Sequence, residues 1–235
     1  KIALLQKLNI DHLVVIPFTE TFANQSAKAY ISDFLVNTFH PHTIIIGYDH
    51  RFGKGRMGDY KLLEEKAPTY HYLVKEIPVY MLQDVTISST KIREAILQGD
   101  IKTASNCLGY DYLFSGRVIK GNQLGRTIGY PTTNLQISDE NKLVPGNGVY
   151  AVLINNEQLK IKNLGGMMNI GVRPTVDGTQ RVIEVNIFEF DQDIYGETIT
   201  ITLKKYLRSE VKFNGLNALK KQLAMDKIAA MEAFS

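Results

Sequence analysis

The chain has 235 residues, 44% of them hydrophobic and 22% charged, which is typical of a globular protein with one large or two modest domains. A net charge of +3 suits small anionic ligands and is weak support for nucleic-acid binding. The single cysteine, Cys107, excludes an intrachain disulfide and fits a reducing, cytoplasmic compartment, and no apolar run approaches the ~20 residues of a membrane span.

Residues 1–109 alternate between helical and strand patterns. Helices are predicted at 1–8, 26–39, 59–66 and 89–98, and strands at 12–18, 43–48, 70–75 and 79–82. The β-branched run at 43–48 indicates a strand buried on both faces. This order predicts a parallel α/β sheet. Because the chain opens at Lys1 inside a helical pattern, we expect its natural N-terminal segment to be missing.

Residues 110–235 have a different rhythm, with period-2 patterns joined by glycine-rich connections. Strands are predicted at 112–119, 149–154, 158–164, 181–190 and 198–203, with a hairpin turn at Asn155-Asn156. A last helix, 215–233, has an apolar stripe of Leu216, Leu219, Leu223, Ile228 and Met231. The pattern predicts an antiparallel barrel or sandwich and a domain boundary near Gly109.

The segment 116–134, GRVIKGNQLGRTIGYPTTN, combines four glycines with basic residues. Such turns let backbone N–H groups approach phosphates. The segment matches neither common nucleotide loop. A phosphate site and a plain turn, with Pro131 starting the next strand, therefore stay equal alternatives. Thr132 and Asn134 lie two positions apart, on one face of a strand, and offer oxygen ligands of the kind that Mg²⁺ prefers.

Two further patterns carry chemistry. The predicted strand 181–190 places Glu184 opposite the core-facing Ile183 and Val185, where it could accept a proton, although a solvated glutamate is favoured from the residues alone. The segment 87–93, ISSTKIR, brings hydroxyls and basic side chains to a helix start and indicates an anion site. The alternative there is capping by Ser89. The loop 47–58 follows a strand, where α/β sheets bind ligands, or is a flexible surface loop.

Several motifs, in order, resemble bacterial riboflavin kinases over essentially all of 110–235. They are the segment 116–134, with Thr133 where the family usually has alanine, NIGVRPT at 169–175, Glu184 with DQDIYG at 191–196, LRSEVKF at 207–213 and the pair Gln222 and Asp226. The segments GYDHRFG at 47–53 and ISSTKIR resemble the FMN adenylyltransferase module that is fused to this kinase in bacterial FAD synthetases. The resemblance implies a partial Rossmann-like nucleotidyltransferase domain, 1–109, and a six-stranded antiparallel barrel with a C-terminal helix, 110–235.

The resemblance also implies roles for individual residues. Glu184 would be the catalytic base, and Thr132 and Asn134 would hold Mg²⁺. ATP would be bound by Gly116, Lys120, Gly121, Gly125, Arg126, Gly129 and Thr132. Asn169, Arg173 and Arg208 would bind the flavin, with 169–175 as a mobile flap. Ser88, Ser89, Thr90 and Arg93 would form the phosphate site of the adenylyltransferase.

The sequence therefore predicts an enzyme that uses Mg-ATP to phosphorylate riboflavin to FMN. The parent protein would also convert FMN to FAD, but this chain lacks the first nucleotide-binding motif of that module. The implied partners are the small molecules riboflavin and ATP, without nucleic acid or membrane. A non-catalytic flavin-binding or regulatory module is the alternative, and a barrel that binds single-stranded nucleic acid is a weaker one, because no basic stripe accompanies the aromatic residues.

Overall fold

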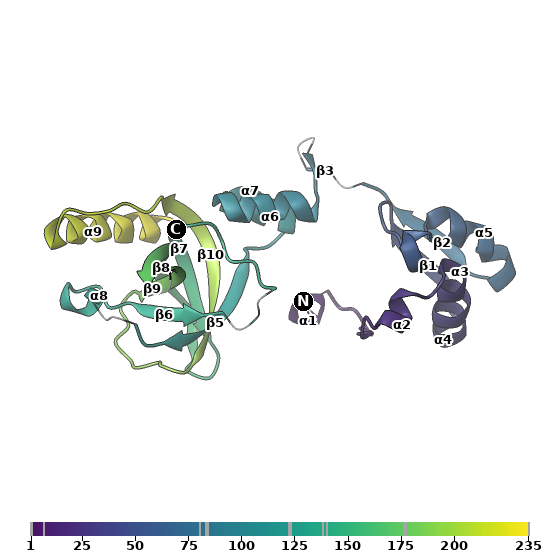
Figure 1. Ribbon diagram of the computed structural model, residues 1–235, viewed down its shortest axis with the longest axis horizontal. Helices are drawn as coiled ribbons and strands as arrows, with labels where there is room; N and C mark the ends of the chain where they lie inside the picture. Colours follow the sequence, from purple (N-terminus) through teal and green to yellow (C-terminus); the bar gives the residue numbers. More distant parts are fainter. Residues whose placement is uncertain are drawn as a thin grey trace. The chain divides into compact units, whose positions relative to one another are not determined.

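The chain divides into two units, Lys1–Met81 and Leu82–Ser235, in the computed structural model (Figure 1). Each unit has its own hydrophobic core. The structure describes residues 2–6, 8–79, 81–82, 85–121, 124–137, 139, 141–175 and 178–234.

Unit 1 is organised around two parallel strands, β1 (Thr43–Gly47) and β2 (Leu73–Ile77), as the predicted α/β order requires. Its core consists of Ala27, Ile31, Ile46, Phe52, Leu63 and Tyr72. The helical elements are α1 (Ile2–Gln6), α2 (Glu20–Ala23), α3 (Ala27–Ala29), the π-helical η1 (Tyr30–Val36), α4 (Asn37–Phe39), the 3-10 turn η2 (Lys54–Arg56) and α5 (Tyr60–Tyr70). The predicted helix 26–39 is thus confirmed as a continuous helical run from α3 to α4.

Two predictions for unit 1 are wrong. The segment 12–18 forms no strand: its backbone pairs with no described strand, and Val15 is 71% exposed. The strand at 43–47 is buried on one face only, since Ile45 is 63% exposed while Ile46 is 5% exposed. The reason is that the core of unit 1 packs against one face of the two described strands. Of the predicted strand 79–82, Tyr80 lies outside the described residues, and β3 (Met81–Leu82) pairs with β4 (Val85–Thr86).

Two helices precede the barrel in unit 2. Helix α6 (Ser89–Gln98) has the predicted bounds, but Ser88, not Ser89, is its N-cap and accepts from the Lys91 amide at 3.3 Å. The helix α7 (Ile101–Leu108) was not predicted. Ile101 belongs to the barrel core. The helices therefore pack with the barrel, whereas the predicted boundary at Gly109 would assign them to the first domain.

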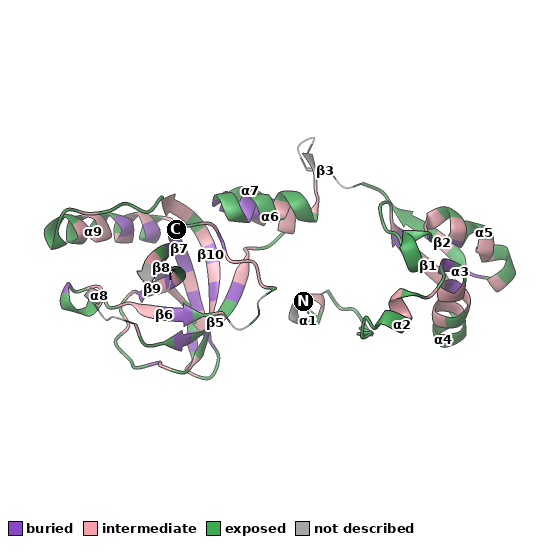
Figure 2. Ribbon diagram, in the orientation of Figure 1, coloured by how far each residue is buried: buried purple, intermediate pink, exposed green. Residues whose placement is uncertain are grey.

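A closed six-stranded antiparallel barrel, in the order β10-β5-β6-β9-β8-β7, forms the centre of unit 2, as predicted. Its strands are β5 (Leu113–Ile119), β6 (Thr133–Gln136), β7 (Gly148–Asn156), β8 (Ile161–Thr175), β9 (Gly178–Ile187) and β10 (Thr198–Arg208). Inward residues alternate with outward ones, so that Ile183, Val185 and Ile187 on β9 are buried in the core. Figure 2 shows this alternation along the strands.

The predicted hairpin turn is wrong, and the predicted flap lies in a paired strand. Asn155 and Asn156 end β7 rather than forming the turn, because the Asn156 side chain accepts from Leu159 N at 2.8 Å and donates to Thr198 O at 2.9 Å. The segment 169–175, predicted as a flap, is the end of β8 and pairs with β9 from Asn169↔Glu184 onward.

Helix α9 (Leu216–Glu232) contacts β7, β8 and β10 and lies along one side of the barrel (Figure 1). Its predicted apolar stripe is wrong in part, because Leu216, Ile228 and Met231 are more than half exposed. Asp226 and Ala230 are the buried residues of α9. The buried face of α9 therefore carries a charged residue, Asp226, which pairs with Arg208. The short helix α8 (Leu124–Thr127) lies within the glycine-rich segment.

Candidate functional site

Three polar side chains lie in a row on neighbouring strands of the barrel. Glu184 on β9 is the register partner of Asn134 on β6 and of Asn169 on β8. Partners in an antiparallel ladder point to the same face. This face is the outer one, because the residues that flank Glu184 point into the core. The barrel therefore brings together Glu184, Asn134 and Asn169, three residues expected at the site.

The glycine-rich segment contacts this row closely. A Cβ at Gly121 would lie 1.6 Å from Asn134 Nδ2, and a Cβ at Gly125 would lie 2.2 Å from Tyr130 O and 3.1 Å from Thr132 Oγ1. No larger residue fits at either position. These glycines were predicted to let the backbone approach phosphates. Within the protein itself they have another role, because each lies too close to a neighbouring residue to carry a side chain.

The other predicted ATP-binding residues are spread along the same segment. Gly116 is on β5, and Gly129 has a left-handed φ of 84° with open space around it. Lys120 lies over the Tyr195 ring, with Nζ 5.7 Å from its centroid.

A cavity of about 240 Å³, the Tyr195 cavity, opens on one side of this segment. Its polar lining includes Arg126, Asp191, Asp193 and Tyr195, and its apolar lining includes Ile187, Phe190 and Ile194. Thr133, the residue that departs from the family pattern, also lines it, and its buried hydroxyl has no partner among the described residues.

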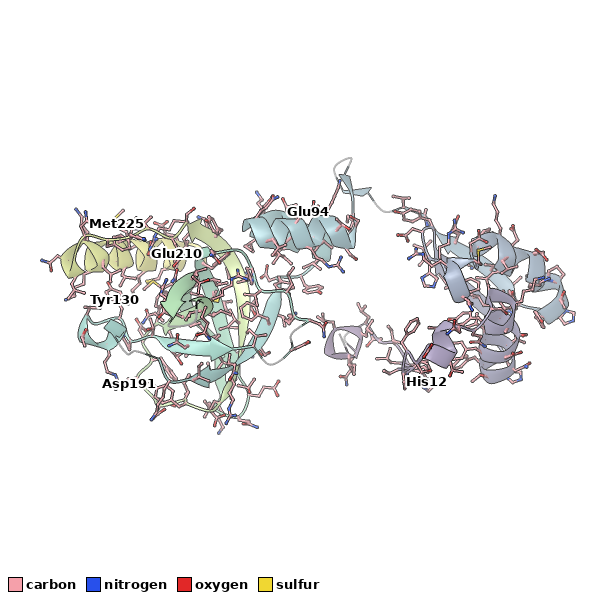
Figure 3. The ribbon with its side chains drawn as sticks, viewed as in Figure 1. His12, Glu94, Tyr130, Asp191, Glu210 and Met225 are labelled. Atoms are coloured by element: carbon pink, nitrogen blue, oxygen red, sulfur yellow. The ribbon has the colours of Figure 1, made fainter. Side chains whose placement is uncertain are left out.

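A larger cavity of about 680 Å³, the Glu184 cavity, lies between the barrel, α9 and the segment after β10. Its wall combines apolar and charged groups: Gly125, Ile128, Tyr130, Thr132, Val149, Met167, Met168, Asn169, Val172, Arg173, Glu184, Asn186, Arg208, Glu210, Val211, Lys212, Phe213, Leu219, Leu223 and Asp226. Figure 3 shows two of these residues, Tyr130 and Glu210, on the side of the barrel where α9 lies, with Asp191 farther from that helix. Thr132 contributes to the lining of both cavities.

Arg173 connects two carboxylates at the Glu184 cavity. Its Nη2 donates to Glu184 Oε2 at 3.2 Å, and its Nη1 donates to Glu210 Oε1 at 2.9 Å. Burial alone would lower the pKa of Arg173, but the hydrogen bonds and charges of Glu210 and Glu184 outweigh it and raise the pKa. Arg173 therefore stays charged and forms ion pairs with both side chains.

Arg208 is largely committed to protein contacts. Its Nε and Nη2 donate to the two oxygens of Asp226 at 2.8 and 2.7 Å, and Nη1 donates to Ser209 O at 2.9 Å. Gln222 donates to Asp226 Oδ1 at 2.9 Å. Asp226 is only 3% exposed, so this bidentate pair joins α9 to the end of β10 inside the structure. The guanidinium still reaches the cavity wall.

Thr132 and Asn134 were predicted to hold Mg²⁺, and the structure allows a test of that fit. Both side chains offer a neutral oxygen, and Asn134 is 9% exposed with its amide nitrogen toward Gly121. Asn186 Nδ2 donates to Pro131 O at 2.7 Å, which fixes the backbone just before Thr132. Such hard oxygen donors suit a cation that keeps several waters and takes few protein ligands. No cluster of three or more His, Cys, Asp or Glu that could hold a metal occurs within the described part of the chain.

The predicted phosphate site of the adenylyltransferase lies at the start of α6. Ser89, Thr90 and Arg93 are exposed, and Ser88 is half-buried. The loop 47–58 belongs to unit 1 and is closed by a bridge between Phe52 and Gly58 and by an ion pair of Arg51 with Asp59. These two parts belong to different units.

Comparison with known proteins agrees with this architecture. The riboflavin kinase family profile matches residues 108–234, and the FAD synthetase profile matches residues 1–91. A barrel of this kind and its flanking cavities therefore define a riboflavin kinase domain, joined to part of an FAD synthetase domain.

The chain belongs to the family of bifunctional riboflavin kinase/FMN adenylyltransferases. It is 38% identical to the Haemophilus influenzae member over its full length and 75% of that relative, and 37% identical to the Escherichia coli member over its full length and 74% of that relative. A crystal structure described as a macrolide-efflux protein from Streptococcus pneumoniae matches 97% of this chain and 72% of that chain, with a TM-score of 0.85 and 32% identity. Within the described residues, no helix combines the length and apolar character that crossing a membrane requires.

Sequence reasoning did not single out Glu210 or Asn186. Glu210 lies inside the quoted motif LRSEVKF, but its partner Arg173 is 37 residues away, and no local pattern marks such a pair. Asn186 shares the outer face of β9 with Glu184 by period 2, and this signal was available.

Proposed function

We propose that this protein transfers the γ-phosphoryl group of ATP to the 5′-hydroxyl of riboflavin, giving FMN and ADP. The observation that carries the proposal is that Thr132 lines both the Tyr195 cavity and the Glu184 cavity, with Glu184 in the wall of the latter. A phosphoryl transfer needs a donor and an acceptor whose reacting atoms meet at one point. Two cavities that share one oxygen-bearing residue, with a carboxylate on the acceptor side, provide this arrangement.

In this proposal the Glu184 cavity takes riboflavin. Its volume of about 680 Å³ and its mixed lining, including Met167, Val172 and Phe213, suit a flat aromatic ring with polar edges. Asn169, Arg173 and Arg208 offer polar groups at that wall, although Arg208 has little donor capacity left beyond Asp226 and Ser209.

Glu184 is the proposed base. It takes the proton of the 5′-hydroxyl as the oxygen attacks the γ-phosphorus and ADP leaves. The glycine-rich segment, with Lys120 and Arg126, covers the ATP phosphates. Thr132 and Asn134 would hold Mg²⁺, which when bound neutralises charge on the phosphate oxygens.

We propose the second activity, adenylylation of FMN to FAD, for the parent protein to which this chain belongs. The chain spans about three quarters of the length of the relatives that it matches. The Ser88, Ser89, Thr90 and Arg93 cluster remains the predicted phosphate site for that reaction. We place the kinase reaction in the cytoplasm, because a single cysteine suits a reducing compartment. The proposed partners are the small molecules riboflavin and ATP, with no role for nucleic acid or a membrane.

The test is to incubate the protein with riboflavin and Mg-ATP and to separate the flavins by chromatography. We expect FMN and an equal amount of ADP, and no FMN when EDTA removes the metal. Riboflavin binding without ADP release would instead support the non-catalytic flavin-binding module. FAD in the product would show that adenylyl transfer also belongs to this chain.

A further inference from the structure

A charged cluster at the wall of the Glu184 cavity exceeds what the proposed roles require. Arg173 on β8 holds Glu184 on β9 with one arm of its guanidinium and Glu210, in the segment after β10, with the other. The side chains of Arg173, Glu184 and Glu210 are 43%, 32% and 31% exposed, so all three are partly shielded from water.

Strand β8 holds the Glu210 carboxylate closely. Arg173 donates to its Oε1 at 2.9 Å, and Asn169 Nδ2 donates to the same oxygen at 3.4 Å. A Cβ at Gly171 would lie 1.9 Å from Oε1 and 2.5 Å from Oε2. The Glu210 carboxylate therefore lies directly against the backbone of Gly171, in space that a side chain at this position would share.

The orientation of Glu184 depends on the same guanidinium. Arg173 holds Oε2 of Glu184, and no other donor to this carboxylate is found among the described side chains. A guanidinium is planar and rigid, so a fixed partner on one arm fixes the direction of the other arm. Glu210 thereby determines where Arg173 places the Glu184 carboxylate.

We propose that Glu210 is a positioning residue that, through Arg173, fixes the orientation of the Glu184 carboxylate for proton transfer. This inference rests on the proposed kinase function. A base works only within hydrogen-bond reach of the proton that it takes, and a displacement of about 1 Å can cost on the order of 100-fold in rate. The hydrogen bonds of Glu210 to described residues go to Asn169 and Arg173 on β8 and not to the predicted ATP-binding segment, so its loss should affect turnover more than ATP binding.

The experiment measures kcat and the KM for ATP of FMN formation in a double-mutant cycle of Glu210→Gln and Arg173→Gln. We expect Glu210→Gln to lower kcat by about 10-fold or more while the KM for ATP changes less than about 2-fold. In the Arg173→Gln background, Glu210→Gln should change kcat by less than about 2-fold, because the connection is already broken. Glu157→Gln, at an exposed glutamate in the turn after β7, is the matched control and should leave kcat unchanged.

Thermal unfolding of each variant shows whether it is folded. Glu210→Asp is the second variant: it keeps the charge but is too short to reach Arg173 and Asn169 together, so its kcat should also fall. Wild-type kcat in a folded Glu210→Gln or Glu210→Asp protein overturns the inference, and so does an undiminished effect of Glu210→Gln in the Arg173→Gln background. A wild-type protein that makes no FMN overturns the proposed function itself and this inference with it.

Discussion

Glu184 is held by its strand and by one charged neighbour. It lies in register between Asn134 and Asn169, and it accepts a hydrogen bond from Arg173 at 3.2 Å. A guanidinium forms strong, directional hydrogen bonds with a carboxylate. The neighbours of Glu184 on β9, Ile183 and Val185, anchor the strand in the core.

Replacing Glu184 by glutamine tests its role as the base. The amide has nearly the same size, so the cavity keeps its shape, but it cannot take a proton. We expect kcat to fall by about 100-fold or more and the affinity for ATP to change less than about 2-fold. Rates of FMN formation and ATP titration calorimetry check this. Unchanged turnover would remove Glu184 from the mechanism, and Glu157→Gln controls for the loss of one surface charge.

Because of Tyr150, the stability of unit 2 should change with pH in the alkaline range. It is fully buried and donates to Gly146 O at 2.7 Å, and burial raises its pKa from 10.0 to about 12. Between these values the unfolded chain loses this proton while the folded chain keeps it, so the unfolded state binds fewer protons and stability falls as pH rises. Below pH 10 the stabilisation is complete.

Between pH 10 and about 12, the free energy of unfolding should fall less in Tyr150→Phe than in the wild type. The two falls should differ by on the order of 2 kcal/mol. At neutral pH the variant should lose about 1 kcal/mol with its hydrogen bond. Urea denaturation at a series of pH values measures both effects. Tyr110→Phe, at an exposed tyrosine, controls for the loss of a hydroxyl. Parallel curves for wild type and Tyr150→Phe would contradict the assignment.

Sequence patterns could single out candidate site residues whose signal lies within a short segment. Glu184, Thr132 and Asn134 follow from period 2 and from motif order, and the structure places Glu184 and Asn134 in register. The partner of Arg173 could not be identified, because Glu210 comes near it only after β8 and β10 have closed the barrel around them.

The joint between α9 and β10 depends on a buried ion pair rather than on an apolar stripe. Asp226 is 3% exposed and accepts from Arg208 through both oxygens. A buried charge without its partner is strongly destabilising. The stripe of apolar residues that predicted the packing of α9 is therefore only part of what attaches this helix.

Neutralising Asp226 should loosen α9. We expect Asp226→Asn to lower the free energy of unfolding of unit 2 by about 3 kcal/mol, because Arg208 would keep its charge without a counterion. Asp111→Asn is the matched control: the Asp111–Lys204 pair, at 2.7 Å, is partly exposed, so the change should cost less than about 1 kcal/mol. Chemical denaturation measures both. Equal effects would mean that burial does not distinguish the two pairs.

Elements with strong local signals were predicted well, and those that depend on pairing were not. Helix α6 has a clear cap and a Gly99 stop, and its bounds were predicted residue for residue. Strand β8 is 15 residues long and includes the segment predicted as a flap, because pairing with β9 extends it past the predicted strand end at residue 164. The segment 12–18 is apolar, but it pairs with no described strand and therefore forms none itself.

For the whole molecule, the placement of α6 and α7 determines where the kinase domain begins. Ile101 is 3% exposed in the barrel core, Gly146 N donates to Ile96 O at 3.2 Å, and Gly99 packs directly on Tyr206. A division at Gly109 would remove these contacts, whereas the two units divide at Met81 and Leu82. The boundary at Gly109 remains a prediction that shortened chains can test.

We expect a chain of residues 82–235 to fold and to keep the turnover of FMN formation. A chain of residues 110–235 should be less stable by at least about 2 kcal/mol, since the burial of Ile96 and Ile101 is lost. Urea denaturation and chromatography of the flavin products compare the two chains. Equal stability would place the boundary at Gly109 and make α6 and α7 an accessory of the barrel.

The barrel closes on itself, so each of its six strands has a partner on both sides. In the described part of unit 1, β1 and β2 have one partner each, namely each other, and carry the exposed apolar side chains Ile45, Leu73 and Ile77. Unpaired strand edges with apolar side chains are templates for pairing with a second chain. Self-association through strand pairing, during concentration or storage, should therefore begin in unit 1 and not in the barrel.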